Sequence, residues 1–152
     1  MKAKTDFDYA GQQALAEATF NSIGDGAITT DEYGNITRFN PMAQKILEYE
    51  EAEALGEYYP KLLGAFDNNE LTVPLIDRPI TRALVSGKII SETIHYKTKS
   101  GQLIPVSLTI SPILVKDNPI GIIGIFRDIT KEYETDKMKS DFISLASHQL
   151  RT

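Results

Sequence analysis

The sequence predicts an α+β domain with a five-stranded antiparallel sheet and helices on one face of it. A long C-terminal helix follows the domain along the chain. Three observations lead to this prediction. A short hairpin pattern is followed by helical segments. Three longer strand patterns come next, separated by short turns. The last stretch, residues 130–152, contains neither proline nor glycine, so we expect one continuous helix there.

The N-terminal part predicts a helix, a hairpin and a second helix. Residues 7–20 place apolar side chains near the helical spacing of about 3.6 and contain no proline. Residues 27–30 and 36–39 are short β-type runs on either side of a turn, which is typical of a hairpin. Asn40 and Pro41 then mark a helix start, because asparagine caps the first turn and proline suits the first helical position.

The middle of the chain is less regular. Residues 48–69 are acidic and include Gly56 and Pro60, so we expect only short helical turns. Residues 79–85 predict a further helix, which ends near Gly87.

The longer strands are expected at residues 89–97, 103–115 and 120–127. Apolar and hydroxyl side chains alternate through residues 106–111, as in a strand buried on one face. Residues 117–119, Asp-Asn-Pro, predict the turn before the third strand. In that strand we expect Gly121 and Gly124 to allow close packing.

The pattern changes to helical after Asp128-Ile129-Thr130. Thr130 is the expected N-cap, and Glu132 and Glu134 lie where the helix dipole favours acidic side chains. We therefore divide the chain into an N-terminal helix (1–22), a folded domain (23–129) and a C-terminal helix (130–152).

Composition excludes several classes of function. The 152 residues suffice for one domain with its own core, and they contain no cysteine. This excludes disulfides, thiolate metal sites, a cysteine nucleophile and flavin photochemistry through a cysteine adduct. The net charge of −5 disfavours nucleic acid as a partner. No run approaches the ~18 apolar residues of a membrane span, and the first residues lack the apolar core of a signal peptide.

Several of these segments together resemble a PAS sensory domain, over residues 15–130. They are Asp25-Gly26-Ala27-Ile28, the turn at 31–34, Phe39-Asn40-Pro41-Met42-Ala43, and residues 121–130, Gly-Ile-Ile-Gly-Ile-Phe-Arg-Asp-Ile-Thr. The resemblance implies the PAS fold and leaves open a small-molecule ligand in its core.

Residues 138–152 are similar to the phosphoacceptor box of bacterial-type sensor histidine kinases. The resemblance implies a homodimer whose parent, using ATP and Mg²⁺, phosphorylates His148 and passes the phosphoryl group to an aspartate of a response regulator. It also implies that Thr152 positions water for dephosphorylation. Gln149 stands where the family usually has an acid that assists phosphorylation, and glutamine cannot take a proton. Because the ATP-binding domain of that family follows the box, we expect this segment alone to be inactive.

Helical geometry supports the accessible position of His148 without the family. At about 100° per residue, His148 lies roughly 140° from the centre of the apolar side, so it faces water or a partner. Met138, Phe142 and Leu145 have the spacing of a coiled-coil seam. The alternative is an amphipathic helix that packs on its own domain.

The remaining expectations concern coupling, ligands and location. Asp128, Ile129 and Thr130 form the covalent route from the last strand to the helix, so we expect them to couple sensing to output. His95 is expected on the sheet as a structural residue, because a single histidine without partner ligands seldom holds metal or haem. We predict no metal site and no cofactor in this segment, and a cytoplasmic location, with a membrane tether in the parent left open. A ligand-binding module and a ligand-free dimerisation adaptor are the other classes of function.

Overall fold

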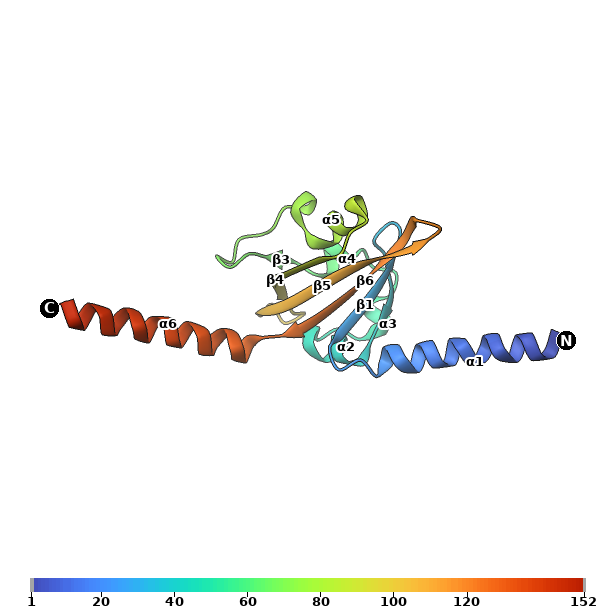
Figure 1. The fold of residues 1–152 in the computed structure, drawn as a ribbon, viewed down its shortest axis with the longest axis horizontal. Coiled ribbons are helices and arrows are strands. Elements are labelled where there is room, and N and C mark those ends of the chain that lie inside the picture. The colour runs from blue at the N-terminus through green and yellow to red at the C-terminus, as the bar shows by residue number, and fades with distance from the viewer. Residues whose placement is uncertain (1, 152) are drawn as a thin grey trace.

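A six-stranded antiparallel sheet forms the centre of the molecule (Figure 1). The computed structural model describes residues 2–151, with side chains from residue 8 onward. Its strands are β1 (Gly26–Asp31), β2 (Ile36–Phe39), β3 (Ala65–Phe66), β4 (Ile90–Lys97), β5 (Leu103–Val115) and β6 (Asn118–Asp128). Their order across the sheet is β2-β1-β6-β5-β4-β3, and all neighbours are antiparallel. The predicted α+β class is confirmed.

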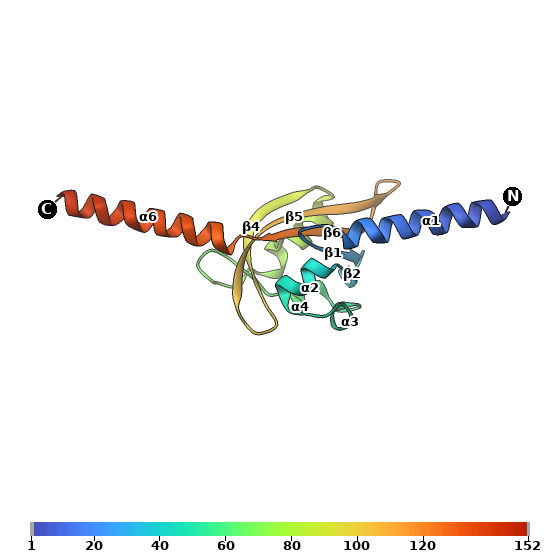
Figure 2. The ribbon, with the colours of Figure 1, turned by 90° about the horizontal axis from the view of Figure 1, so that it is seen from below.

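Short helices cover one face of the sheet, and two longer helices leave the domain. The helices are α1 (Lys2–Asn21), α2 (Pro41–Leu47), α3 (Glu51–Ala54), α4 (Tyr59–Leu62), α5 (Pro79–Ser86) and α6 (Thr130–Arg151), with a 3₁₀ turn at Leu75–Asp77. Figures 1 and 2 show α1 and α6 extending in opposite directions from the domain. Within residues 2–151, no helix has both the length and the hydropathy to span a membrane.

Alternation along β5 separates an inner from an outer face of the sheet. Ile104, Val106 and Leu108 are buried against the helices on the inner face, whereas Ser107 and Thr109 are exposed on the outer face. From Val106 to Ile110, β5 therefore contributes every second side chain to the core, as its sequence predicts.

Two local features differ from the prediction. The sixth strand, β3, lies in the segment where we expected only helical turns, and it pairs with Tyr96 and His95 of β4. The turn between β5 and β6 falls at Lys116 and Asp117, earlier than predicted, because both residues adopt positive φ values of 50° and 65°. Such a two-residue turn matches the twist of the flanking strands and lets β6 begin at Asn118.

The two strand glycines differ in how closely they pack. A Cβ atom at Gly121 would lie 1.9 Å from the carbonyl oxygen of Thr30, so only glycine fits beside β1. At Gly124 the nearest atom to such a Cβ, the hydroxyl of Tyr59, would be 3.4 Å away. The expectation of close packing therefore holds at Gly121, while Gly124 leaves ordinary contact distance.

The side chain of Asn40 joins α2 to the first strand. It is fully buried, and its Oδ1 accepts hydrogen bonds from the backbone N–H groups of Ala43 in α2 (2.8 Å) and Ala27 in β1 (2.9 Å). Its Nδ2 donates to the carbonyl oxygen of Asp25 at 3.0 Å. Asn40 is thus the predicted N-cap and also a tertiary link.

Asn40→Ala should lower the free energy of unfolding by about 2–3 kcal/mol, because it removes the cap and leaves buried N–H groups unpaired. Urea denaturation measures this change. Asn69→Ala, at an exposed loop position, is the control and should change stability by less than about 0.5 kcal/mol. Equal stability of the two variants would contradict the role of Asn40.

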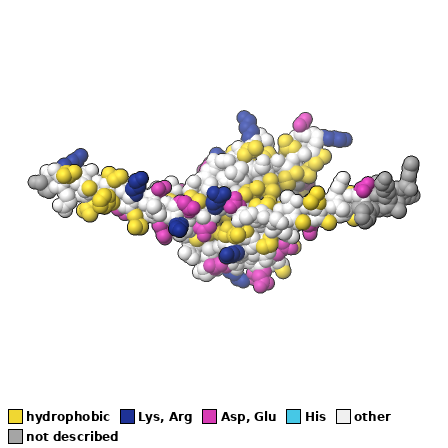
Figure 3. Space-filling view, turned by 60° about the horizontal axis from the view of Figure 1, so that its bottom comes forward, with side chains coloured by type: hydrophobic (Ala, Val, Ile, Leu, Met, Phe, Trp, Pro, Cys, Tyr) yellow, Lys and Arg dark blue, Asp and Glu magenta, His cyan; other side chains and the backbone are white. Residues whose placement is uncertain are grey.

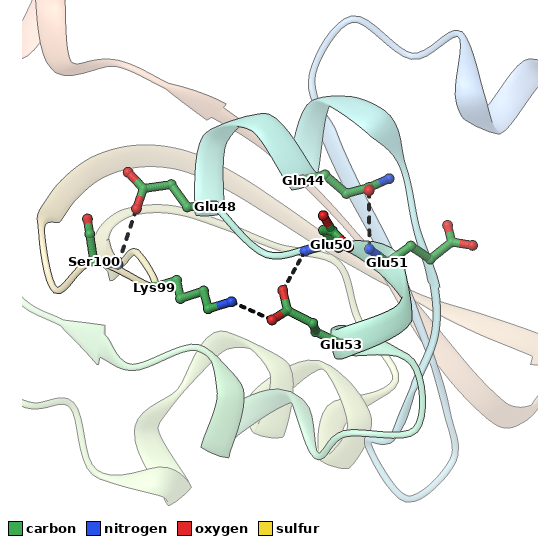
Figure 4. Close-up of polar contacts among 7 residues, drawn as sticks. All are labelled: Gln44, Glu48, Glu50, Glu51, Glu53, Lys99 and Ser100. Carbon is green, nitrogen blue, oxygen red and sulfur yellow. Dashed lines mark hydrogen bonds and ion pairs between the residues drawn. The ribbon is translucent and has the colours of Figure 1, made fainter.

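A polar latch ties α2 and α3 to the turn between β4 and β5 (Figure 4). Glu48 accepts a hydrogen bond from the backbone N–H of Ser100 at 3.1 Å, and Glu53 forms an ion pair with Lys99. The backbone N–H of Lys99 also donates to the carbonyl oxygen of Leu47 at 3.0 Å. Hydrogen bonds from Ser100 lower the pKa of Glu48, and the hydrogen bond from Lys99 lowers the pKa of Glu53.

The latch should weaken in acid. Carboxyl groups with a lowered pKa in the folded protein stabilise it above their unfolded pKa, and this contribution disappears as the pH falls through the folded pKa. Between about pH 6 and pH 3, the chain should therefore lose more thermal stability than the double variant Glu48→Gln/Glu53→Gln. Melting temperatures across this range measure the difference. With Glu134→Gln, an exposed control on α6, the loss should equal that of the unsubstituted chain.

Candidate functional site

Asp128 caps the helix that carries the candidate phosphoacceptor. Thr130 is the first residue of α6, and its backbone N–H donates to Oδ1 of Asp128 at 2.9 Å. The hydroxyl of Thr130 donates to the same oxygen. The expectation that Thr130 itself is the cap is therefore wrong: the carboxylate two residues earlier accepts the N–H group that the helix leaves unpaired.

Ile129 connects the sheet to the helix through its backbone. Its N–H donates to the carbonyl oxygen of Pro105 in β5 at 3.0 Å, and its own carbonyl oxygen accepts from Tyr133 at 2.8 Å. Neighbouring strands β5 and β6 and the first turn of α6 thus meet at this residue.

Tyr133 contacts the sheet one turn further along α6. Its ring packs against the ring of His95 in β4, with 5.4 Å between the ring centroids and an angle of 89° between the ring planes. His95 is buried on the outer face of the sheet, which confirms its expected place on the sheet; its purely structural role stays a prediction. The sequence analysis missed Tyr133, although its four-residue separation from Ile129 places both on one side of a helix.

The rest of α6 stands clear of the domain. No residue of α6 is buried, and Met138, Phe142 and Leu145 are 71%, 70% and 60% exposed. Figure 3 shows apolar side chains gathered along this helix, toward its C-terminal end. The alternative of an amphipathic helix packed on its own domain is not what the structure shows.

The candidate phosphotransfer residues lie at the far end of α6. His148 and Gln149 are both exposed in its last turns, far along the helix from the sheet. Thr152 lies outside the described residues. The structure thus leaves His148 accessible, and its phosphorylation stays a prediction.

A cleft of about 540 Å³ opens beside the start of α6 on the inner side of the sheet. It is bounded by α2, by the turn between β4 and β5, and by Asp128 and Thr130. Asp25 and Arg127 also line it and form an ion pair of 3.2 Å. The hydrogen bond to Asp25 raises the pKa of Arg127 above its usual value. A group bound in this cleft would contact the domain and the helix start together.

The interior of the domain is filled by side chains. The hydroxyl groups of Tyr59 and Tyr96 form a buried hydrogen bond, and burial raises the pKa of both phenols, so both stay protonated at neutral pH. The cavity between these tyrosines, α5 and the sheet has a volume of about 10 Å³. That is about the space of one water molecule.

Comparison with known proteins identifies the domain. A PAS domain family model matches residues 24–131. The chain is 27% identical over 160 residues to Drug sensory protein A of Synechocystis sp. (strain ATCC 27184 / PCC 6803 / Kazusa), covering 95% of this chain and 24% of that protein. It is 28% identical over 137 residues to the signal transduction histidine-protein kinase AtoS of Escherichia coli (strain K12), covering 89% of this chain and 21% of that protein.

A third relative is named as a different class of enzyme, a probable diguanylate cyclase. The chain is 30% identical over 136 residues to the probable diguanylate cyclase DgcE of Escherichia coli (strain K12), covering 88% of this chain and 12% of that protein. The chain thus spans about a quarter or less of the length of these relatives.

Solved structures agree with this fold. The crystal structure of the PAS domain of a protein from Colwellia psychrerythraea superimposes with a TM-score of 0.62 at 23% identity, covering 81% of this chain and 98% of that one. The family match, from residue 24 to residue 131, spans the sheet from β1 to β6 and the start of α6. The chain therefore belongs to the PAS domain family.

Proposed function

We propose that this chain is the sensory and dimerisation segment of a two-component sensor histidine kinase, whose parent phosphorylates His148. The observation that carries the proposal is the placement of this histidine. It is exposed near the end of a helix that continues from the last strand of the PAS sheet. The similarity to a histidine-protein kinase over 89% of the chain supports it.

The proposed reaction is phosphoryl transfer to imidazole. A ring nitrogen of His148 attacks the γ-phosphorus of ATP, the bond to the ADP oxygen breaks, and the proton of the ring is released after a phosphoramidate has formed. The kinase domain of the parent supplies Mg²⁺ and the positive charge that stabilise the transferring group. An aspartate of a response regulator then accepts the phosphoryl group. Residues 2–151 comprise the PAS domain and its two flanking helices, so we expect this segment by itself to be inactive.

Gln149 affects the rate rather than the identity of the reaction. Its amide can orient the imidazole of His148 by a hydrogen bond, whereas it cannot accept a proton. A neutral imidazole attacks through its free nitrogen without prior deprotonation, so phosphorylation proceeds without an acid at this position.

Dimerisation follows from the exposed apolar side of α6. Met138, Phe142 and Leu145 lie at the spacing of a coiled-coil seam, and all three are largely exposed. A contiguous apolar patch of this kind is unusual on a monomer. A second copy of α6 would cover it and would place two His148 side chains on the outside of the pair.

Signal coupling is assigned to Asp128, Ile129 and Thr130. They join the last strand to α6 through the cap and through the hydrogen bond to Pro105. A shift of β6 therefore moves the first turn of α6. The cytoplasm, where ATP is available to the parent, is the proposed location.

A PAS module with another output is the second candidate function. The diguanylate cyclase relative favours it, because its match also covers most of this chain. The sequence that follows residue 152 in the parent distinguishes the two: a second helix and an ATP-binding domain support the kinase. An absorption spectrum of the purified chain tests the proposal that the filled core holds no coloured cofactor.

Phe142→Ala should weaken the dimer by roughly 100-fold, because one large apolar side chain is lost from each copy of the seam. Sedimentation equilibrium measures the dissociation constant. Tyr33→Ala is the matched control, since Tyr33 is an equally exposed aromatic residue in the turn between β1 and β2. A purely monomeric unsubstituted chain would rule out this interface.

His148→Ala in the full-length parent should abolish labelling by ATP carrying a radioactive γ-phosphate. The label on the unsubstituted parent should be acid-labile and base-stable, as a phosphoramidate is. Ser144→Ala, one turn earlier on α6, should keep the label. Gln149→Glu should raise the rate by up to about 100-fold, the usual scale of general-base assistance. Label that persists in His148→Ala would show that another residue is phosphorylated.

A further inference from the structure

The first turn of α6 covers a small part of the outer face of the sheet. His95 of β4 and Pro105 of β5 lie opposite each other there, and both are buried. Their neighbours on the same face, Thr93 and Ser107, are exposed. The ring of Tyr133 contributes to this difference, because its centroid lies 5.4 Å from that of the His95 ring. Phe66 of β3, which pairs with His95, flanks it on the other side. We call these three residues, His95, Pro105 and Tyr133, the tyrosine socket.

Tyr133 is the side chain that anchors α6 in this socket. From residue 131 to residue 145, every side chain except that of Tyr133 is exposed. The other attachments lie together at the helix start: the hydrogen bond from Ile129 to Pro105 and those from Thr130 to Asp128. A helix held at a single point can swing, whereas a second attachment one turn away fixes its direction.

The imidazole of His95 acts in the socket by packing. Its Nδ1 is the one side-chain nitrogen or oxygen atom of the described residues that is both buried and without a hydrogen-bond partner. Such an unpaired atom lowers stability, so hydrogen bonding at Nδ1 does not hold the ring in place. The perpendicular arrangement of the two rings, at 89°, is one that aromatic pairs favour.

We propose that His95 and Tyr133 are positioning residues that set the direction of α6 relative to the sheet. The contact reaches the helix from β4, two strands away from β6, so α6 responds to the centre and edge of the sheet and not only to the strand that precedes it. The further step, that this direction governs phosphorylation of His148, rests on the proposed function. The positioning of α6 by His95 and Tyr133 is independent of the proposed function.

The absence of cysteine allows a direct test. Val85→Cys on α5 and Ser144→Cys on α6, both exposed, accept spin labels for distance measurement by double electron–electron resonance. Labelled chain is diluted with unlabelled chain, so that distances within one copy dominate. We expect one narrow distance distribution, which Tyr133→Ala and His95→Ala broaden. Tyr133→Phe and His95→Phe, which keep the rings, should leave it narrow, as should the neighbouring control Glu134→Ala.

The melting temperature separates positioning from stability. His95→Phe removes the unpaired nitrogen and should melt at the same temperature or higher while α6 keeps its direction. Hydrogen exchange of the sheet amides verifies that each variant is folded. Tyr133 is partly exposed, so Tyr133→Ala should stay folded. If His95→Ala unfolds, the distances in Tyr133→Ala therefore test the positioning of α6. An unchanged distribution in Tyr133→Ala, or one as broad in His95→Phe as in His95→Ala, would overturn the proposal.

The parent kinase gives an independent readout. There, Tyr133→Ala should change the rate at which ATP labels His148, while Tyr133→Phe and Glu134→Ala should not. If the distances change but no histidine of the parent is ever labelled, the proposed function fails and the socket stands. If labelling is normal and the distances do not respond to Tyr133→Ala, the socket fails and the proposed function stands.

Discussion

The buried amide of Asn40 is the interaction on which the arrangement of the domain depends. Its Oδ1 accepts one hydrogen bond from the backbone N–H of Ala43 and one from that of Ala27, so the same atom caps α2 and binds β1. β1 in turn pairs along its whole length with β6, which leads into α6. Loss of this single side chain would therefore loosen the helical layer, the first strand and, through β6, the base of α6.

Periodicity along the chain was sufficient to predict most elements, because burial on one face leaves a local pattern. The alternation in β5 and the Asn40-Pro41 start of α2 are examples. β3 was missed because two residues carry no period, and their pairing with Tyr96 and His95 depends on residues far along the chain. Asp128, and not Thr130, accepts the hydrogen bond at the start of α6 because of where β6 ends. Residue types alone do not show where that strand ends.

The candidate site was predictable in part for the same reason. A motif at residues 138–152 points to His148, and the helical period places that residue away from the apolar side. The contact between His95 and Tyr133 has no such local signal, since it joins a strand to a helix that lies against the outer face of the sheet, far along the chain. The filled interior around Tyr59 and Tyr96 also arises from packing of α4 against the sheet, which the acidic segment at 48–69 did not predict.

Because α6 is attached only at its first turn, a small change of its tilt there displaces its far end by a larger distance. Tyr133 and His148 are separated by about 22 Å along the axis, at about 1.5 Å per residue. A tilt of roughly 5° at the base would then carry His148 sideways by about 2 Å, which is comparable to the misplacement that costs a phosphoryl acceptor its alignment. Small rearrangements of the sheet, too slight to open its core, are in this way large enough to move the distant end of the helix by an atomic diameter or so.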